Sequence, residues 1–346
     1  MSVPEEGAGP TFSVLIASYN QAEYVLATLD TVAAQSRADY EIVVVNDGST
    51  DDTEARVSGW IERFRASHPN RAVLDTIPNS GQSAAVEHGF GLCTGRYIAL
   101  LDSDDLWLPH KLATIAQVAA ESPDAGMIIH PLYVIDSQGR RTGDVRPKHA
   151  KLSEGDLREQ IRKTSRVAAP ATSGVIIRAD VFRQLVPMPI KHFRAAADFY
   201  LTLGAALLAP VRAVAEPLAE YRMHPGGVHI RTMLSPEGVG RWVELQSVLA
   251  KHFGLEEVVG RNSYFVRHVF ALAKFQGSAA EQVHSYSQLT RATWIDGTFG
   301  VRQKLLFTAY WTACLVSPRP VFSRLWRTFQ MKQTGFDKIG LAPERA

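Results

Sequence analysis

Three carboxylates within four positions are the feature of this chain best suited to chemistry. The apolar run Tyr97–Leu101, which predicts a buried strand, ends in Asp102, Asp104 and Asp105. Carboxylates this close repel one another unless a cation or a proton relieves the repulsion. Mg²⁺ and Mn²⁺ prefer oxygen ligands and usually bind through one or two carboxylates plus substrate phosphates. The segment therefore predicts a metal–diphosphate site, with a helix cap before Pro109 as the simpler alternative.

An alternation of strands and helices must position these carboxylates. The expected strands are Phe12–Ala17, Glu41–Asn46, Ala72–Ile77 and Tyr97–Leu101. The helices expected between them are Ala22–Gln35, a helix from Thr50 or Asp51 to Ala66, and Gln82–Leu92. Asn20 is expected to cap the first of these helices. This alternation predicts an α/β fold with a doubly wound, mainly parallel, Rossmann-like sheet and helices on both faces. Further along, the expected elements are strands at Met127–Ile135 and Gly174–Arg178 and a helix at Asp198–Leu208.

Polar loops follow each of the first three predicted strands. They are Ser18-Tyr19-Asn20, Asn46-Asp47-Gly48-Ser49-Thr50 and Asn79-Ser80-Gly81-Gln82. In a parallel sheet these loops lie at the same edge as Asp102–Asp105, where open α/β folds bind nucleotides.

Composition narrows the class of protein. The chain has 346 residues, 46% hydrophobic and 21% charged, which is typical of a globular protein. Its two cysteines, Cys93 and Cys314, form neither a disulfide framework nor a metal-ligand spacing, and they fit a reducing compartment. The first ten residues do not resemble a signal peptide, and no apolar run is long enough to span a bilayer.

The set of segments around these loops resembles family 2 glycosyltransferases of the GT-A fold. The matching text is SVLIASYNQAEYVLATLDTVAAQS, EIVVVNDGSTDDT, NSGQSAA and GRYIALLDSDDLWLPHKL, and the resemblance runs from about Phe12 to His224. It implies a glycosyltransferase domain at 11–225, with a nucleotide-sugar half at 11–110 and an acceptor half at 111–225. A disordered leader at 1–10 and a helical, basic region at 226–346 are expected to flank this domain.

The resemblance implies roles for the donor loops. The first loop would contact the nucleotide, and Asp47 would read the base edge, although an Asp-Gly turn is the plain structural alternative. Asp104 would hold Mg²⁺ or Mn²⁺, and His224 is a second candidate for the metal. The residues expected to bind the nucleotide sugar are Ala17, Ser18, Tyr19, Asp47, Gly81, Gln82, Asp102 and Ser103. Val86 and Glu87 stand where the family often has Arg or Asn.

The same resemblance implies an acceptor half. Asp198 matches the catalytic base, although Ala197 replaces the usual Glu before it, and a helix-terminal carboxylate is the alternative for Asp198. The residues expected on the acceptor side are Asp105, Trp107, Ser173 and Gly174. The implied reaction is metal-assisted, inverting transfer of a sugar from a nucleotide-diphosphate sugar to a glycan or lipid-linked acceptor.

Other classes fit the sequence less well. A phosphatase or a nucleotidyltransferase would need motifs that the loops after the first and fourth strands lack. A catalytically degenerate sugar-nucleotide binding protein is the non-enzymatic alternative, supported by Ala197.

The C-terminal part differs in charge from the rest. Residues 1–225 hold 22 Lys and Arg against 27 Asp and Glu, whereas residues 226–346 hold 15 against 8. Leu305–Val316 predicts a buried or re-entrant helix, and Val321–Met331 predicts an amphipathic helix with Phe322, Leu325, Trp326 and Phe329 on one side. We expect residues 301–332 either to dock on an anionic membrane or to pack on the protein itself. No motif predicts nucleic-acid binding, and the expected location is cytoplasmic or peripheral on the inner face of the cell membrane.

Overall fold

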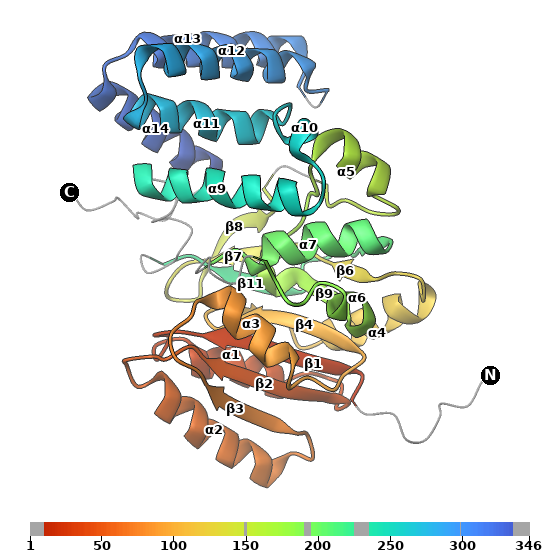
Figure 1. The fold of residues 1–346 in the computed structure, drawn as a ribbon. Coiled ribbons are helices and arrows are strands. Elements are labelled where there is room, and N and C mark those ends of the chain that lie inside the picture. The colour runs from red at the N-terminus through yellow and green to blue at the C-terminus, as the bar shows by residue number, and fades with distance from the viewer. Residues whose placement is uncertain (1–9, 149–150, 190–194, 225–234, 298, 335–346) are drawn as a thin grey trace. The chain divides into compact units, whose positions relative to one another are not determined.

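The computed structural model describes residues 10–148, 151–189, 195–224, 235–297 and 299–334 (Figure 1). The chain forms two compact units. The first comprises Met1–Arg158 and Val167–Arg222, and the second comprises Glu159–Arg166 and Met223–Ala346. Nearly all of the predicted leader at 1–10 lies outside the described residues, and so does the predicted domain boundary between residues 225 and 226.

A seven-stranded sheet forms the centre of the first unit. Its strands, in chain order, are β1 Phe12–Ser18, β2 Tyr40–Asn46, β3 Ala72–Thr76, β4 Tyr97–Asp102, β6 Met127–Ile129, β9 Val175–Arg178 and β10 Val211–Ala213. The spatial order is β10-β6-β9-β4-β1-β2-β3, and β9 alone in this sheet runs antiparallel to its neighbours. The predicted mainly parallel α/β sheet is thus confirmed.

Helices cover both faces of this sheet, because its central strands are apolar on both sides. One face packs with α1, α2 and α4 in a core that includes Ile16, Leu29 and Ile61. On the other face α3 approaches so closely that a Cβ added at Gly89 would lie 2.4 Å from Leu15 Cδ1. The helices of the first unit are α1 Val25–Ala33, α2 Thr53–Ser67, α3 Gln82–Phe90, α4 Lys111–Glu121, α6 Ala179–Arg183 and α7 Ala197–Leu208.

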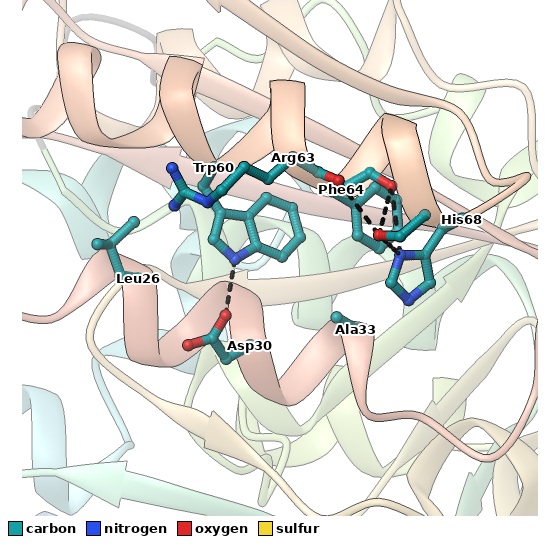
Figure 2. Close-up of a pocket in the computed structure, with 8 residues that line it drawn as sticks. Leu26, Asp30, Ala33, Trp60, Arg63, Phe64 and His68 are labelled. Atoms are coloured by element: carbon teal, nitrogen blue, oxygen red, sulfur yellow. Dashed lines mark hydrogen bonds between the residues drawn. The ribbon is translucent and has the colours of Figure 1, made fainter.

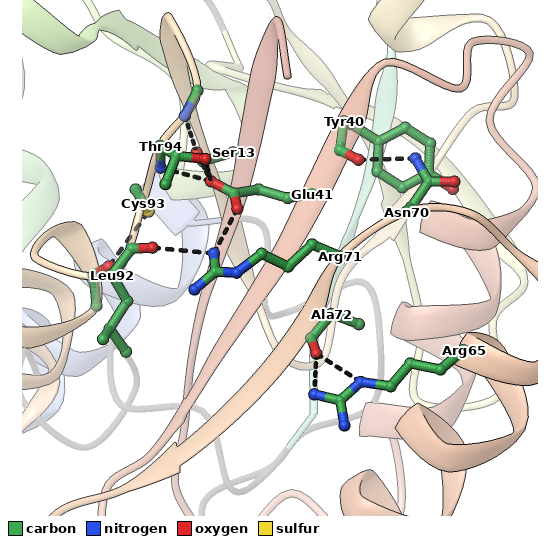
Figure 3. Close-up of polar contacts among 12 residues, drawn as sticks. Ser13, Tyr40, Glu41, Arg65, Asn70, Arg71, Ala72, Leu92, Cys93 and Thr94 are labelled. Carbon is green, nitrogen blue, oxygen red and sulfur yellow. Dashed lines mark hydrogen bonds and ion pairs between the residues drawn. The ribbon is translucent and has the colours of Figure 1, made fainter. Parts of the chain in front are cut away.

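A buried carboxylate fastens the starting edge of the sheet, where the parallel strands begin (Figure 3). Glu41 is fully buried and accepts hydrogen bonds from Ser13 Oγ (2.6 Å), Thr94 N (2.5 Å) and Arg71 Nη1 (2.5 Å). Burial alone would raise the pKa of Glu41, but these donors outweigh it and lower that pKa. One side chain therefore ties together the starts of β1, β2, β3 and β4.

The predicted strand Met127–Ile135 is wrong as a single element. It is divided at His130-Pro131 into β6, in the large sheet, and β7 Leu132–Ile135, in a second sheet. Proline cannot donate to a strand ladder, so the chain changes partners there. The second sheet has the order β5-β11-β7-β8, with β5 Leu106–Trp107, β8 Arg141–Arg146 and β11 Ala219–Arg222.

The prediction that Asn20 caps a helix from Ala22 is also wrong. Asn20 has φ of +52°, its side-chain oxygen accepts from Thr50 N (2.8 Å), and α1 begins only at Val25. Ala22 N donates to Asp51 rather than to a cap within its own helix. The first loop is therefore held by the second loop.

The second unit is helical, as predicted for this region. Its helices are α5 Arg158–Thr164, α9 Pro236–His252, α10 Glu256–Val259, α11 Ser263–Gln276, α12 Ala279–Ile295, α13 Val301–Val316 and α14 Arg319–Thr334. Arg158, the first residue of α5, belongs to the first unit. Side-chain caps begin three of them: Ser235 for α9, Asn262 for α11, and a capping box of Ser278 with Glu281 for α12. In the described part of the chain, no helix has the length and apolar character that a membrane span requires.

The predicted aromatic stripe of α14 lies inside this unit. Phe322 and Trp326 are fully buried in a core with Phe270 and Trp311, and Leu325 and Phe329 pack against that core. Of the two alternatives expected for residues 301–332, docking on a membrane is therefore wrong for these four stripe residues. The alternative, that the stripe packs on the protein itself, is what the structure shows.

We predict that Trp326→Ala lowers the free energy of unfolding by about 3–5 kcal/mol, because it leaves a large cavity in this core. Val321 lies on the same helix but is 46% exposed, so Val321→Ala is the matched control and should change stability by less than about 0.5 kcal/mol. Denaturant unfolding of both variants measures the difference. Equal stability of the two variants would contradict the packing described.

Candidate active site

The polar loops meet at the carboxyl edge of the large sheet, as predicted. Ser18 on β1 pairs in register with Asn46 on β2, and Asn46 pairs with Thr76 on β3. On the other side of β1, Ala17 pairs with Asp102 on β4. The four parallel strands therefore deliver their following loops to one place.

Asp47 joins the second loop to the third. Its carboxylate oxygens accept from Ser80 N (2.6 Å) and Gly81 N (2.8 Å), and Asn79 Nδ2 donates to the Asp47 carbonyl (2.8 Å). Gly81 has φ of +95°, a conformation that favours glycine. A carboxylate has further lone pairs, so base recognition by Asp47 stays a prediction alongside this observed structural role.

A fully buried carboxylate holds the loop that carries the other acidic residues. Asp105 accepts from Ser173 Oγ (2.6 Å) and from Arg222 N (2.8 Å). Ser173 Oγ in turn accepts from Asp102 N (3.0 Å). Burial, followed by the charges of Asp104 and Asp102, raises the pKa of Asp105 well above its ordinary value. The end of β4 is thereby joined to β11 and to η1 (Thr172–Gly174), the turn before β9.

Two buried cations, Lys111 and Arg222, also hold the loop that carries the acidic residues. Lys111, fully buried, donates to the Ser173 carbonyl (2.6 Å) and lies 3.9 Å above the ring of Trp107. Burial lowers the pKa of Lys111 well below its usual range, although the nearby Asp105 opposes that shift. Arg222 Nε donates to the Asp104 carbonyl (2.8 Å), so it fixes the backbone of the predicted metal ligand.

Asp102 and Asp198 lie close enough to interact. Burial raises the pKa of Asp102 to about 8, and the charges of Asp104 and Asp198 add to that rise. Gln82 lies between their elements: its Nε2 donates to Asp102 Oδ1 (3.0 Å), and its Oε1 accepts from Ala196 N (3.4 Å). Gln82 thus connects the end of β4 to the start of α7.

Asp198 lies in the first turn of α7. Burial raises its pKa to about 6, and the backbone N–H of Phe199 only partly opposes this. The residue before the helix, Ala196, has φ of +103°, which is unusual for a residue with a Cβ. Backbone strain of this kind concentrates at functional sites.

The carboxylates at this edge fit a divalent cation. No group of three metal-ligating side chains occurs among the described residues, so these residues alone do not form a complete ligand cage. A cation beside Asp104 and Asp102 would relieve the repulsion that raises the pKa of Asp102. Magnesium-type ions are commonly held by one or two carboxylates together with substrate phosphates, and this site offers that arrangement.

Two buried serine hydroxyls lie near the same edge, and only one of them was predicted from the sequence. Ser18 Oγ, at the end of β1, and Ser83 Oγ, in the first turn of α3, have no hydrogen-bond partner in the described ranges. Ser18 was predicted to contact the nucleotide, whereas Ser83 was missed. A serine beside Gly81 and Gln82 at a helix N-terminus is the sequence signal that could have indicated Ser83.

The other predicted residues differ in their exposure. Tyr19 is 44% exposed at the edge, while the Ser103 carbonyl is turned inward and accepts from Thr28 Oγ1 (3.0 Å). The predicted acceptor-side residues are all buried: Asp105, Trp107, Ser173 and Gly174. Their predicted place beside the acceptor stays a prediction. A Cβ at Gly174 would lie 2.4 Å from the His130 carbonyl, so glycine is needed there for packing.

His224 belongs to the second unit and is buried. Its predicted role as a metal ligand stays a prediction. Arg222, two residues before it, was not predicted as a site residue, although it lies within the stretch from Phe12 to His224 over which the resemblance runs.

Two surface hollows in the first unit lie apart from these carboxylates. One, of about 400 Å³, lies between α1 and α2 (Figure 2). There Trp60 Nε1 donates to Asp30 (2.7 Å). The ring of Phe64 stacks on the ring of Trp60, and the ring of His68 stacks on that of Phe64. The other is lined by Arg96, Arg178, Ala179 and Asp180. Neither contains any of the predicted site residues.

Comparison with known proteins agrees with this geometry. Residues 13–185 match the family described as glycosyl transferase family 2. An uncharacterized glycosyltransferase of Nostoc sp. is 34% identical over 219 residues, which are 63% of this chain and 66% of that protein. Residues 1–349 of S. aureus TarS in complex with UDP-GlcNAc share the fold, with a TM-score of 0.58, 19% identity and coverage of 94% of this chain and 92% of that one.

A second solved structure is also similar. It is the mannosyltransferase PcManGT from Pyrobaculum calidifontis in complex with GDP-Man and Mn²⁺, with a TM-score of 0.52, 16% identity and coverage of 96% of this chain and 88% of that one. Fold and site together define a GT-A-type enzyme that uses a nucleotide-sugar donor. The chain belongs to glycosyl transferase family 2, and it is a glycosyltransferase.

We predict that Ser173→Ala destabilises the protein by about 1–3 kcal/mol, because it leaves the buried Asp105 carboxylate without one donor. It should also weaken donor binding, because Asp102 N loses its acceptor. Ser247 is exposed on α9, and Ser247→Ala should change neither quantity. Thermal unfolding with and without nucleotide sugar measures both effects.

Proposed function

We propose that this chain transfers a sugar, with inversion, from a nucleoside-diphosphate sugar to a hydroxyl of a glycan or lipid-linked acceptor, with Asp198 as general base. The observation that carries the proposal is the position of Asp198, which is close enough to the strand-end carboxylates to raise the pKa of Asp102. In a direct displacement the base contacts the acceptor hydroxyl on the side of the anomeric carbon opposite the leaving diphosphate, so it must lie within reach of the carboxylates that face the diphosphate. The proximity of Asp198 to Asp102 supports that arrangement.

The pKa of Asp198 suits this role. At about 6 it is higher than that of an ordinary Asp, because burial disfavours the charged form. A general base is most effective when its pKa lies near the working pH, since it is then ionised yet basic enough to accept a proton. An exposed Asp with an ordinary pKa would be a weaker base.

The proposed reaction is a single displacement. The acceptor oxygen forms a bond to the anomeric carbon while the bond from that carbon to the diphosphate oxygen breaks. The acceptor proton passes to Asp198, and the nucleoside diphosphate departs with the bonding electron pair. Attack from the face opposite the leaving group inverts the anomeric configuration.

Asp104 and Asp102 would hold Mg²⁺ or Mn²⁺, which when bound supplies positive charge that stabilises the departing diphosphate. Arg222 and Asp105 keep the backbone of this loop in place, and Ser18 and Ser83 offer buried donors near the same edge. One structural neighbour contains GDP-Man and Mn²⁺ and another contains UDP-GlcNAc, which supports this assignment.

A catalytically inactive sugar-nucleotide binding protein is the second candidate, because Ala197 stands where the resemblance leads one to expect Glu. This candidate binds donor without turning it over. Activity that depends on Asp198 separates the two functions.

We predict that Asp104→Asn weakens Mn²⁺-dependent binding of the donor while leaving the fold intact. UDP-GlcNAc and GDP-mannose are the probes, and calorimetry with and without Mn²⁺ is the measurement. Asp124 is exposed on the first unit, so Asp124→Asn serves as the control and should bind like the unaltered protein. Undiminished Mn²⁺-dependent affinity in Asp104→Asn would refute the metal assignment.

We predict that Asp198→Asn retains donor binding but loses transfer by about 10²–10⁴-fold, the range typical of an acid–base group. In the unaltered enzyme kcat/KM should fall as pH decreases through about 6, because the Asp198 carboxylate becomes protonated below its raised pKa. Release of nucleoside diphosphate in the presence of acceptor measures both. A flat profile down to pH ~4.5, well below that pKa, would show that the base is a different group.

A further inference from the structure

Helix α13 is largely apolar on both its buried and its outer side, although its first turn carries Arg302, Gln303 and Lys304. Its sequence is VRQKLLFTAYWTACLV, and Trp311 and Cys314 are its buried side chains. A helix that is apolar on two opposite sides normally buries both of them in a protein or a membrane. The outer side of α13 therefore indicates a contact beyond the described residues.

The outer side of α13 presents a continuous apolar face. Val301, Leu305, Leu306 and Val316 are 56–77% exposed. At about 100° per residue, these four fall on one side of the helix together with exposed Ala309, Thr312 and Ala313, opposite Trp311 and Cys314. Arg302 is the one charged residue within this set, which we call the α13 outer face.

The end of α12 extends this apolar surface. Trp294 is 43% exposed, and Ile295 is 58% exposed. The indole Nε1 of Trp294 donates to Thr308 Oγ1 on α13 (3.1 Å), and Lys304 Nζ donates to the Trp294 carbonyl (2.8 Å). These bonds hold the tryptophan beside α13 with part of its ring open to solvent. Tryptophan partly buried in this way is common at the boundary between water and lipid.

The charge around this surface has one sign. From Gly297 to Val316 the sequence contains no Asp or Glu, and its cations are Arg302, within the outer face, and Lys304, which is bonded to the Trp294 carbonyl. Arg291, exposed on α12, lies one turn from Trp294 and Ile295. An apolar face that carries cations and no carboxylate is complementary to a surface of apolar chains beneath anionic head groups.

We propose that the α13 outer face, with Trp294 and Ile295, docks this enzyme on an anionic lipid bilayer. Sixteen residues are too few for a usual membrane span, so α13 would lie in the plane of the interface. The face is distinct from the α14 stripe, which is committed to the core. The proposal does not depend on the transfer reaction.

A second copy of the chain is the main competing occupant. Leu306, Ala309, Ala313 and Val316 are spaced by three and four residues, as in a helix-pairing seam. A symmetric pair would, however, bring the Arg302 side chains of two copies close together, with no acidic residue of α13 to offset them. The charge therefore favours anionic lipid over self-association.

Sedimentation of the full-length protein with vesicles tests the proposal. We expect binding to vesicles of phosphatidylglycerol mixed with phosphatidylcholine, weakening as salt rises, and little binding to phosphatidylcholine alone. The double variant Leu305→Glu with Leu306→Glu should lose at least about tenfold in affinity, because two leucines can no longer be buried. Its melting temperature should stay close to that of the unaltered protein, since both positions are exposed.

Leu208→Glu is the matched control, because Leu208 is 41% exposed at the end of α7 in the first unit. It should bind anionic vesicles like the unaltered protein. Failure of the unaltered protein to sediment with anionic vesicles at low salt would overturn the proposal, and so would equal binding by the α13 double variant. A dimer in solution that the double variant converts to a monomer would assign the face to a second copy instead.

Discussion

The buried carboxylate of Asp105 is the interaction on which the active site depends. It cannot reach water, so it must be satisfied by protein donors, and Ser173 and Arg222 provide them from segments about 70 and 120 residues further along the chain. Ser173 simultaneously accepts from Asp102 N, and Arg222 holds the Asp104 carbonyl. The backbone that presents the two neighbouring carboxylates is thereby fixed from both sides. Exposed acidic residues on an unsupported loop would separate under their mutual repulsion.

This arrangement divides three neighbouring aspartates among different tasks. Asp105 is fully buried and structural, whereas Asp102 and Asp104 remain partly exposed at the edge. Gln82 then joins Asp102 to the strained turn at Ala196 that precedes Asp198. A displacement of β4 would therefore be transmitted to Asp198, the proposed base, so that the donor and acceptor halves of the proposed reaction keep their spacing.

Much of this structure could be predicted from the sequence. The apolar runs of β1, β2 and β4 identify a sheet buried on both faces, and the polar loops after them identify its candidate functional edge. The role of Asp105 could not be predicted, because its partners are distant in the chain and no local pattern indicates which of three adjacent aspartates turns inward.

Asn20 looked like a helix cap because its residue type favours caps, but tertiary hydrogen bonds to Thr50 prevailed. The α14 stripe was correctly recognised as one face of a helix. Periodicity alone, however, does not reveal whether protein or lipid covers such a face.

The two ends of the large sheet should respond to acid in opposite directions. Glu41, at the starting edge, has a lowered pKa, so its stabilising contribution is lost as pH falls through that pKa. Asp102 and Asp105, at the carboxyl edge, have raised pKa values, so the folded protein binds protons that the unfolded chain has already released, and stability falls as pH rises towards those values. The metal-free enzyme should consequently be most robust in mildly acidic solution, between the two limits. A cation that lowers the pKa of Asp102 would move this optimum towards neutrality, so that the metal-loaded protein tolerates neutral pH better than the metal-free protein does.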